Sequence, residues 1–312
     1  MNRMALGTAC GLTAASIWGG MYVVSDVVLQ VVPPAMLLVM RYALALLVLA
    51  PAFWFTRDRG ISRRDWPEMA LVAFVGFGVS LLAQFWGTAL STAAAGAVIT
   101  SATPAFIVLF AWPVLRQAPT PPKLAGLALA TVGVLIVSLG SGQAISEQAR
   151  APVLGNLLLV VAAVTWALYT VLARRATRRY SSLAVTLAVT LLGLLIVSPV
   201  ALWEAGAQDI GPLTPGVVAG IVYIGIGSTA IAFFLWNKSF ELLDAATASL
   251  FFFAQPVVGI VLSALLLPDQ TLALSFFAGA ALIGLGVVLA LMSDARQPIC
   301  ARPIEQRAYD EG

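Results

Sequence analysis

SLAVTLAVTLLGLLIVSPVALW occupies residues 182–203 and contains no charged side chain. A helix of about 20 apolar residues is long enough to cross the hydrocarbon core of a bilayer. Similar runs recur along the chain, so we predict an all-α membrane protein with ten transmembrane helices. They lie near residues 5–28, 35–55, 67–89, 93–114, 123–141, 153–173, 182–203, 215–236, 245–267 and 271–292.

The composition supports this reading. Hydrophobic residues make up 61% of the 312 residues and charged residues only 10%, whereas a soluble domain carries about a quarter charged residues. We therefore expect the lipid bilayer to be the main partner of the chain surface. The positive net charge of +3 indicates no nucleic-acid partner, because the basic residues lie in short loops that face an anionic leaflet.

Basic residues are concentrated in the termini and in alternate connections between the predicted helices. By the positive-inside rule, this distribution predicts that both termini are cytoplasmic. The first apolar run is too long for the core of a signal peptide, so we expect an uncleaved helix and a multi-pass protein of a bacterial inner membrane. The basic residues on the predicted cytoplasmic side are Arg3, Arg57, Arg59, Arg63, Arg64, Arg116, Lys123, Arg174, Arg175, Arg178, Arg179, Lys238, Arg296, Arg302 and Arg307.

Several kinds of chemistry lack the residues they need. The chain has no His and only two Cys, Cys10 and Cys300. Neither a metal cluster nor a disulfide framework is expected from this set. An enzyme would also need acid, base or nucleophile groups that face one another. We therefore predict that the protein is not an enzyme and has no catalytic residue, metal or cofactor.

Landmarks in the first half recur in the second half at an offset of about 150 residues. Trp18 in IWGGMY corresponds to Trp166 in TWALYT, FVGFG (74–78) corresponds to YIGIG (223–227), and Pro104 corresponds to Pro256. Glycines match as well, since Gly126 and Gly133 correspond to Gly279 and Gly286. The pattern predicts a five-helix repeat at 1–142, a second repeat at 143–293 and a cytoplasmic tail at 294–312, which we expect to be disordered.

An odd number of helices per repeat has a direct consequence. The second repeat must enter the membrane from the opposite side, which makes the two repeats inverted. Inverted repeats around a binding site near the bilayer midplane are typical of secondary transporters. We expect a central cavity between the repeats, alternating access to it and a small-molecule substrate. The sequence leaves open whether the protein is a monomer or a homodimer.

Over about residues 1–292 the chain resembles the ten-helix EamA-type carriers of the drug/metabolite transporter (DMT) superfamily. The resemblance rests on SIWGG and VTWAL, on PPAMLLVMRYALA with Arg41, on the TP and QP pairs, and on the glycine-spaced fifth and tenth helices. Such carriers usually have an acidic residue after the fourth and ninth helices, and here Gln117 and Asp269 lie at those places. The resemblance implies export of small metabolites, amino acids or drugs.

Candidate substrate-binding residues follow from helical spacing, since residues three or four apart share a face. Trp18 and Tyr22 lie on one stripe, and Trp166 and Tyr169 on another; their rings offer apolar and cation–π contacts. Anchoring at the membrane interface is the alternative for tryptophans, and we prefer it for those near helix ends. These are Trp54, Trp66, Trp86, Trp112, Trp203 and Trp236. Gating is the alternative for Trp86 and Trp236, which match in the repeat.

Pro104 and Pro256 are predicted helix kinks, because proline removes a backbone hydrogen bond in a helix interior. Thr100 and Gln255, beside the kinks, and Gln84, in the third helix, are further candidates for substrate binding. A polar side chain in a membrane helix normally faces protein or water. The alternatives are kinks that only shape the bundle and a Gln84 that only joins helices.

Arg41 is a charged residue inside a predicted span. It could bind a substrate carboxylate or form a charge pair with Asp26; alternatively, it extends to the membrane interface. Asp26 is also the candidate for carrying protons, and facilitated transport without coupling is the alternative.

Together these features predict a secondary transporter that exports small amphipathic metabolites such as amino acids. The sequence also allows efflux of lipophilic cationic drugs or a non-transporting membrane scaffold.

Overall fold

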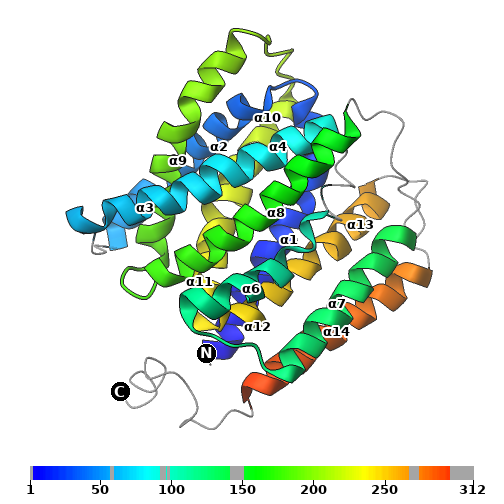
Figure 1. The fold of residues 1–312 in the computed structure, drawn as a ribbon. Coiled ribbons are helices and arrows are strands. Elements are labelled where there is room, and N and C mark those ends of the chain that lie inside the picture. Colours follow the sequence, from blue (N-terminus) through cyan, green and yellow to red (C-terminus); the bar gives the residue numbers. More distant parts are fainter. Residues whose placement is uncertain are drawn as a thin grey trace.

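The computed structural model describes residues 3–56, 60–91, 96, 99–140, 151–266 and 274–295, and the regular elements in these ranges are all helical (Figure 1). We call the described residues up to 140 the first half and those from 151 the second half. The elements of the first half are α1 (Arg3–Leu29), α2 (Pro34–Thr56), η1 (Arg63–Asp65), α3 (Trp66–Ala73), η2 (Phe74–Ser80), α4 (Leu81–Leu90), α6 (Thr103–Leu115) and α7 (Pro121–Gly140).

The second half is helical in the same way. Its elements are α8 (Pro152–Ala176), α9 (Ser182–Ala205), α10 (Pro215–Val222), η3 (Tyr223–Ile231), α11 (Ala232–Leu242), α12 (Ala245–Ser249), η4 (Leu250–Phe253), α13 (Ala254–Leu266) and α14 (Leu274–Ala295). Asp269 and most of the predicted tail, residues 296–312, lie outside the described residues.

Six helices are long and apolar enough to cross a membrane: Arg3–Leu29, Pro34–Thr56, Arg63–Leu90, Val153–Ala176, Ser182–Ala205 and Pro215–Leu242. Four shorter apolar helices accompany them, namely Thr103–Leu115, Pro121–Ile136, Ala245–Gly259 and Phe277–Met292. The described residues therefore form an all-helical structure with several helices able to cross a membrane, as the sequence predicts.

Side-chain caps mark where several helices begin. Ser181 Oγ accepts the backbone N–H of Ala184 at 3.0 Å at the start of α9. Asp244 Oδ1 accepts two N–H groups at the start of α12, from Ala246 at 3.1 Å and Thr247 at 3.2 Å. Such caps satisfy N–H groups that have no partner inside the helix.

The third long span and its counterpart in the second half each contain a π-helical segment. These segments, η2 and η3, include FVGFG and YIGIG, which the sequence pairs. Each presents a backbone carbonyl to a side chain of another helix: Phe77 O accepts from Tyr42 Oη at 2.7 Å, and Ser228 O accepts from Trp18 Nε1 at 2.9 Å. π-Helical turns are rare and often occur at functional sites.

Helices of the first half pack chiefly on helices of the second half. α1 packs on α11 and α13, α2 on α9, α4 and α6 on α8, and α7 on α14. Figure 1 shows α7 and α14 side by side at one edge of the molecule. The two halves are therefore interleaved and do not form separate bundles.

The main helix–helix contacts are unchanged when each helix is replaced by its counterpart in the other half. In that exchange α1 becomes α8, α2 becomes α9, the α3–α4 span becomes α10–α11, α6 becomes α13 and α7 becomes α14. The contact of α1 with α11 then becomes that of α8 with α4, and the contact of α1 with α13 becomes that of α8 with α6; both are present. The pairs α2–α9 and α7–α14 map onto themselves. The packing thus follows the correspondence seen in the sequence.

Glycines allow α7 and α14 to approach closely. A Cβ atom at Gly126 would lie 2.6 Å from the carbonyl oxygen of Gly286, and one at Gly133 would lie 2.6 Å from that of Gly279. The earlier glycine of each helix therefore meets the later glycine of the other, so the two helices are antiparallel. Close backbone contact through small residues is typical of helix packing in membranes.

Tryptophans near helix ends divide into two groups. Trp54, Trp112 and Trp203 are exposed, as expected for residues that face lipid or its interface. Trp236 is fully buried, and its ring lies 5.2 Å from that of Trp18, centroid to centroid. Interface anchoring is therefore wrong for Trp236, because α11 continues well past it to Leu242 and packs against α1.

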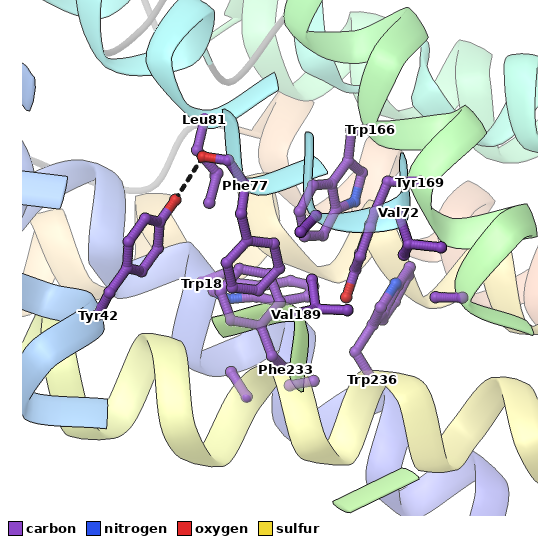
Figure 2. Close-up of a cluster of buried hydrophobic side chains, with 14 of the residues drawn as sticks. Trp18, Tyr42, Val72, Phe77, Leu81, Trp166, Tyr169, Val189, Phe233 and Trp236 are labelled. Carbon is purple, nitrogen blue, oxygen red and sulfur yellow. Dashed lines mark hydrogen bonds between the residues drawn. The ribbon is translucent and has the colours of Figure 1, made fainter. Parts of the chain in front are cut away.

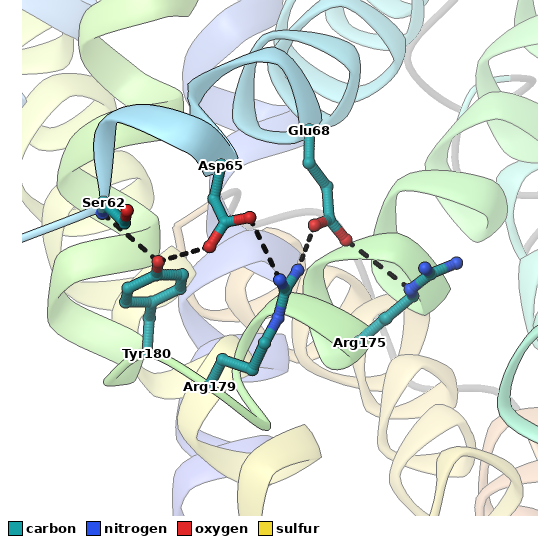
Figure 3. Close-up of polar contacts among 6 residues, drawn as sticks. All are labelled: Ser62, Asp65, Glu68, Arg175, Arg179 and Tyr180. Atoms are coloured by element: carbon teal, nitrogen blue, oxygen red, sulfur yellow. Dashed lines mark hydrogen bonds and ion pairs between the residues drawn. The ribbon is translucent and has the colours of Figure 1, made fainter.

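A polar network joins α3 to the connection between α8 and α9 at the predicted cytoplasmic end (Figure 3). Arg179 forms ion pairs with Asp65 at 3.1 Å and with Glu68, Arg175 Nε lies 3.6 Å from Glu68, and Tyr180 Oη donates to Asp65 at 2.5 Å. Hydrogen bonding and charge from Glu68, with a further contribution from Asp65, raise the pKa of Arg179 above its ordinary value. The network connects the first half to the second.

Candidate functional site

A cavity of about 30 Å³ lies where elements of both halves meet. A volume of this size holds roughly two water molecules. Its polar lining consists of Tyr22, Arg41, Ser80, Gln84, Thr100, Thr103 and Gln255. Its other lining residues are Trp18, Met21, Leu81, Ala162, Ala163, Trp166, Phe233 and Phe252.

Aromatic side chains form one wall of the cavity. Three of them, Trp18, Trp166 and Phe233, are labelled in the buried cluster of Figure 2. The ring of Trp18 lies 5.5 Å from that of Trp166, 5.4 Å from that of Phe233 and 6.4 Å from that of Phe252, measured between centroids. Because Trp18 also donates to Ser228 O, its indole is held in one orientation. Aromatic pairs at such distances add stability beyond the area they bury.

A directed chain of hydrogen bonds runs along another part of the wall. Thr100 Oγ1 donates to the backbone oxygen of Gly96 at 2.6 Å, so Tyr22 Oη is the donor in its 2.8 Å contact with Thr100. Tyr22 must then accept from Gln84, whose Nε2 lies 2.9 Å away. The chain therefore orients the Gln84 amide, with Nε2 toward Tyr22 and Oε1 left as an acceptor.

Arg41 lies in the protein core with no exposed surface. Its Nε donates to Thr229 Oγ1 at 2.7 Å and its Nη2 to Ser228 Oγ at 3.4 Å. The guanidinium also lies over the rings of Phe85 and Phe233, at 5.2 and 5.8 Å from their centroids. The arginine does not extend to the membrane interface; it lines the cavity. The side chain of Asp26, its predicted partner, lies outside the described residues.

Four polar atoms around the cavity have no hydrogen-bond partner among the described residues. They are Arg41 Nη1, Thr103 Oγ1, Trp166 Nε1 and Gln255 Nε2, and all four are buried. Buried polar groups in proteins are normally satisfied. A cluster of unsatisfied groups around one cavity therefore indicates a place for a polar ligand or water.

Breaks in helix geometry bring several of these side chains to the cavity. Ser101 and Ala102 form a turn, and Pro104 lies in the first turn of α6 that follows it. Pro256 likewise lies in the first turn of α13, directly after the 3₁₀ segment η4. In both places the regular α-helical geometry changes just before the proline, at residues 101–102 and at Leu250–Phe253; a helix kink at each proline stays a prediction. Proline is well tolerated in a first helical turn.

Six of the seven predicted substrate-binding residues line this one cavity: Trp18, Tyr22, Gln84, Thr100, Trp166 and Gln255. Tyr169 is not among the lining residues. It is fully buried beside Trp166, with ring centroids 4.7 Å apart, and its Oη lies 3.4 Å from Asn237 Nδ2. The prediction did not include Thr103 or Ser80. Their one signal is that both are polar residues in apolar helices.

Comparison with known proteins identifies relatives along most of the chain. A sequence model of the EamA-like transporter family matches residues 5–139 and 153–292. An uncharacterized transporter of Bacillus subtilis, YetK, is 26% identical over 89% of this chain and 85% of its own length. A probable terminal-alkyne amino-acid exporter of Streptantibioticus cattleyicolor is 25% identical over 70% of both chains.

A solved protein structure has the same fold. It superposes with a TM-score of 0.77 and 23% sequence identity, covering 93% of this chain and 98% of the other.

Proposed function

We propose that this chain, which belongs to the EamA-like transporter family, exports small amphipathic metabolites such as amino acids by alternating access. The family and the relatives make it a membrane transporter. The more specific proposal, export of small amphipathic metabolites, rests on the cavity. Its wall combines aromatic rings with oriented hydrogen-bonding groups, and both halves of the chain contribute to it. Such a lining suits a solute with an apolar body and a polar end.

An inverted repeat would supply the movement that alternating access requires. Two observations support ten spans in this arrangement: the contacts survive exchange of the halves, and α7 and α14, which correspond in sequence, run antiparallel. Parallel repeats would instead bring Gly126 to its own counterpart, Gly279. Two similar halves can exchange conformations, which changes the side of the membrane to which the cavity opens.

The present cavity must widen before a solute can bind. An amino acid does not fit in about 30 Å³, so a binding-competent conformation has to separate some of the lining side chains. Movement of one half against the other would do this, because the lining residues belong to both halves.

Membrane topology tests the repeat. Reporters fused after Arg64 and after Gly142 should lie on opposite sides of the membrane, because three predicted spans separate these positions. Reporters in the same compartment would contradict the inverted arrangement and the alternating-access scheme that depends on it.

Transport itself is measured with purified protein in proteoliposomes. Vesicles loaded with an unlabelled amino acid should take up the labelled one by saturable exchange, with large apolar and aromatic amino acids preferred. Protein-free vesicles provide the control. The absence of exchange across a broad panel of amino acids and small metabolites would defeat the proposal. A non-transporting membrane scaffold would then be the favoured function.

Export of amino acids, rather than uptake, is suggested by the named activity of the Streptantibioticus relative. Overexpression should then reduce the amount of amino acid that accumulates in cells fed with dipeptides.

Efflux of lipophilic cations is less compatible with the site, because the charged residue among the described lining residues is Arg41. A resistance profile against cationic drugs distinguishes the two.

A further inference from the structure

We propose that Arg41 binds the carboxylate of the transported solute, so that the substrate class is monocarboxylates with an apolar or aromatic body. This inference rests on the proposed transport function and names the substrate class of the same cavity.

The guanidinium of Arg41 is held through two of its three nitrogens, and the third, Nη1, is buried without a hydrogen-bond partner among the described residues. Thr229 accepts from Nε and Ser228 from Nη2. Two hydroxyl groups thus position the arginine without neutralising it. A buried cation is costly unless an anion or several acceptors compensate its charge. A ligand with a carboxylate would supply that anion.

The other unsatisfied groups around the cavity also favour a ligand that accepts hydrogen bonds. Trp166 Nε1 and Arg41 Nη1 can only donate, Gln255 Nε2 is an amide donor and the hydroxyl of Thr103 can donate. All four atoms are buried and lack a partner among the described residues. A carboxylate has two oxygens that together accept about four hydrogen bonds. The cavity therefore matches a carboxylate in charge and in hydrogen bonding.

Charge also excludes other ligand classes. None of the described residues that line the cavity is acidic, so a lone cation would meet Arg41 with no compensating charge. A phosphate dianion would exceed the single positive charge that the described lining residues carry. An ammonium group next to the carboxylate can contact aromatic faces and the Gln84 oxygen.

Four compounds with the same phenyl ring test this assignment. L-Phenylalanine and 3-phenylpropionate carry a carboxylate, whereas L-phenylalaninamide and 2-phenylethylamine do not. The readouts are thermal stabilisation of the purified protein by each compound and its inhibition of counterflow. We expect both carboxylates to act at concentrations at least about tenfold lower than the other two, because a buried charged group left unsatisfied strongly penalises an analogue that lacks the carboxylate. Equal or stronger action of 2-phenylethylamine would overturn the proposal.

Substitution of Arg41 tests whether this residue causes the preference for carboxylates. Arg41→Lys keeps the charge but loses the planar fork, and should weaken carboxylate binding about tenfold. Arg41→Gln should abolish the difference between the acid and the amide. Arg63→Gln is the matched control, because Arg63 is exposed in η1. A carboxylate preference that persists in Arg41→Gln would contradict the proposal. If that variant does not fold, the four-compound comparison on the wild-type protein tests the proposal by itself.

The two proposals fail in different ways. If carboxylates stabilise the protein but no compound in the panel exchanges across vesicles, the carboxylate site stands and transport fails. If a cation exchanges and carboxylates have no effect, transport stands and the carboxylate site is wrong. No preference for carboxylates in either readout also rejects the site.

Discussion

Trp18 and Trp166 contact each other edge to face, with ring centroids 5.5 Å apart and ring planes at 86°. They occupy the same position in the two halves of the sequence. Two equivalent residues of a two-fold arrangement can touch only close to its axis. Under the inverted-repeat proposal, this contact places the axis beside the cavity wall, where relative movement of the halves would reshape the site most directly.

Trp18→Phe should destabilise the protein by more than the loss of side-chain volume alone would. The variant keeps an aromatic ring but removes the donor to Ser228 O, and loss of a partner for a buried group costs ~1–3 kcal/mol. Thermal unfolding in detergent measures the effect. Trp112→Phe is the control, because Trp112 is 62% exposed and should change little. Equal effects of the two substitutions would contradict the role of this hydrogen bond.

Tyr22→Phe should reduce transport several-fold while lowering stability by only about 1 kcal/mol. The hydroxyl connects Gln84 to Thr100, so its loss frees the amide of Gln84 to rotate. Counterflow rates and melting temperatures should be measured together. Ser198→Ala is a suitable control, since this hydroxyl donates to Leu194 O within its own helix. A variant with wild-type transport would show that the orientation of Gln84 is irrelevant.

Gly126→Ala and Gly286→Ala should each lower the melting temperature. Either Cβ would lie within 2.6 Å of a backbone oxygen on the facing helix, and backbone cannot move aside as a side chain can, so a cost of roughly 1–3 kcal/mol is expected. Gly284→Ala in the same helix should have no such effect, because a Cβ there meets nothing within 4 Å. The contact between α7 and α14 is not as described if all three variants behave alike.

Arg179→Gln should lower thermal stability slightly, and the difference from the wild type should shrink as the NaCl concentration rises. Arg179 pairs with Asp65 and Glu68 but is 45% exposed, so salt screens its interactions and each contributes little. Melting curves at low and high salt measure this. Arg63→Gln should show neither effect. A deficit that is independent of salt would indicate that Arg179 acts through packing instead.

The helix bounds could be predicted closely from apolar runs. The run at 182–203 corresponds to α9 (Ser182–Ala205), and that at 5–28 corresponds to α1 (Arg3–Leu29). The interleaving of the halves could not be predicted, because lipid-facing and protein-facing positions use the same residues. In α2, Leu37 is fully buried and Leu47 is 72% exposed. No amphipathic pattern distinguishes them, so neighbours cannot be read from the sequence.

Much of the site could be predicted for a physical reason: a polar side chain in a membrane span has few places to go except toward protein. That reasoning identified Gln84, Thr100 and Gln255. It did not place Thr103 among the binding residues, although Thr103 lies directly before Pro104. The orientation of Arg41 was also beyond reach, since its partner Thr229 is 188 residues away.

The interleaved packing has a consequence for biogenesis. A ribosome that has released only α1 to α7 into the bilayer has made segments whose main neighbours have not yet been synthesised. Because α14 is the principal neighbour of α7 and is synthesised after it, α7 can gain its main contact only once α14 has been made. A nascent chain that stops before Leu274 would therefore leave α7 without its main neighbouring helix. Such a chain would be an incomplete product that membrane quality control could recognise.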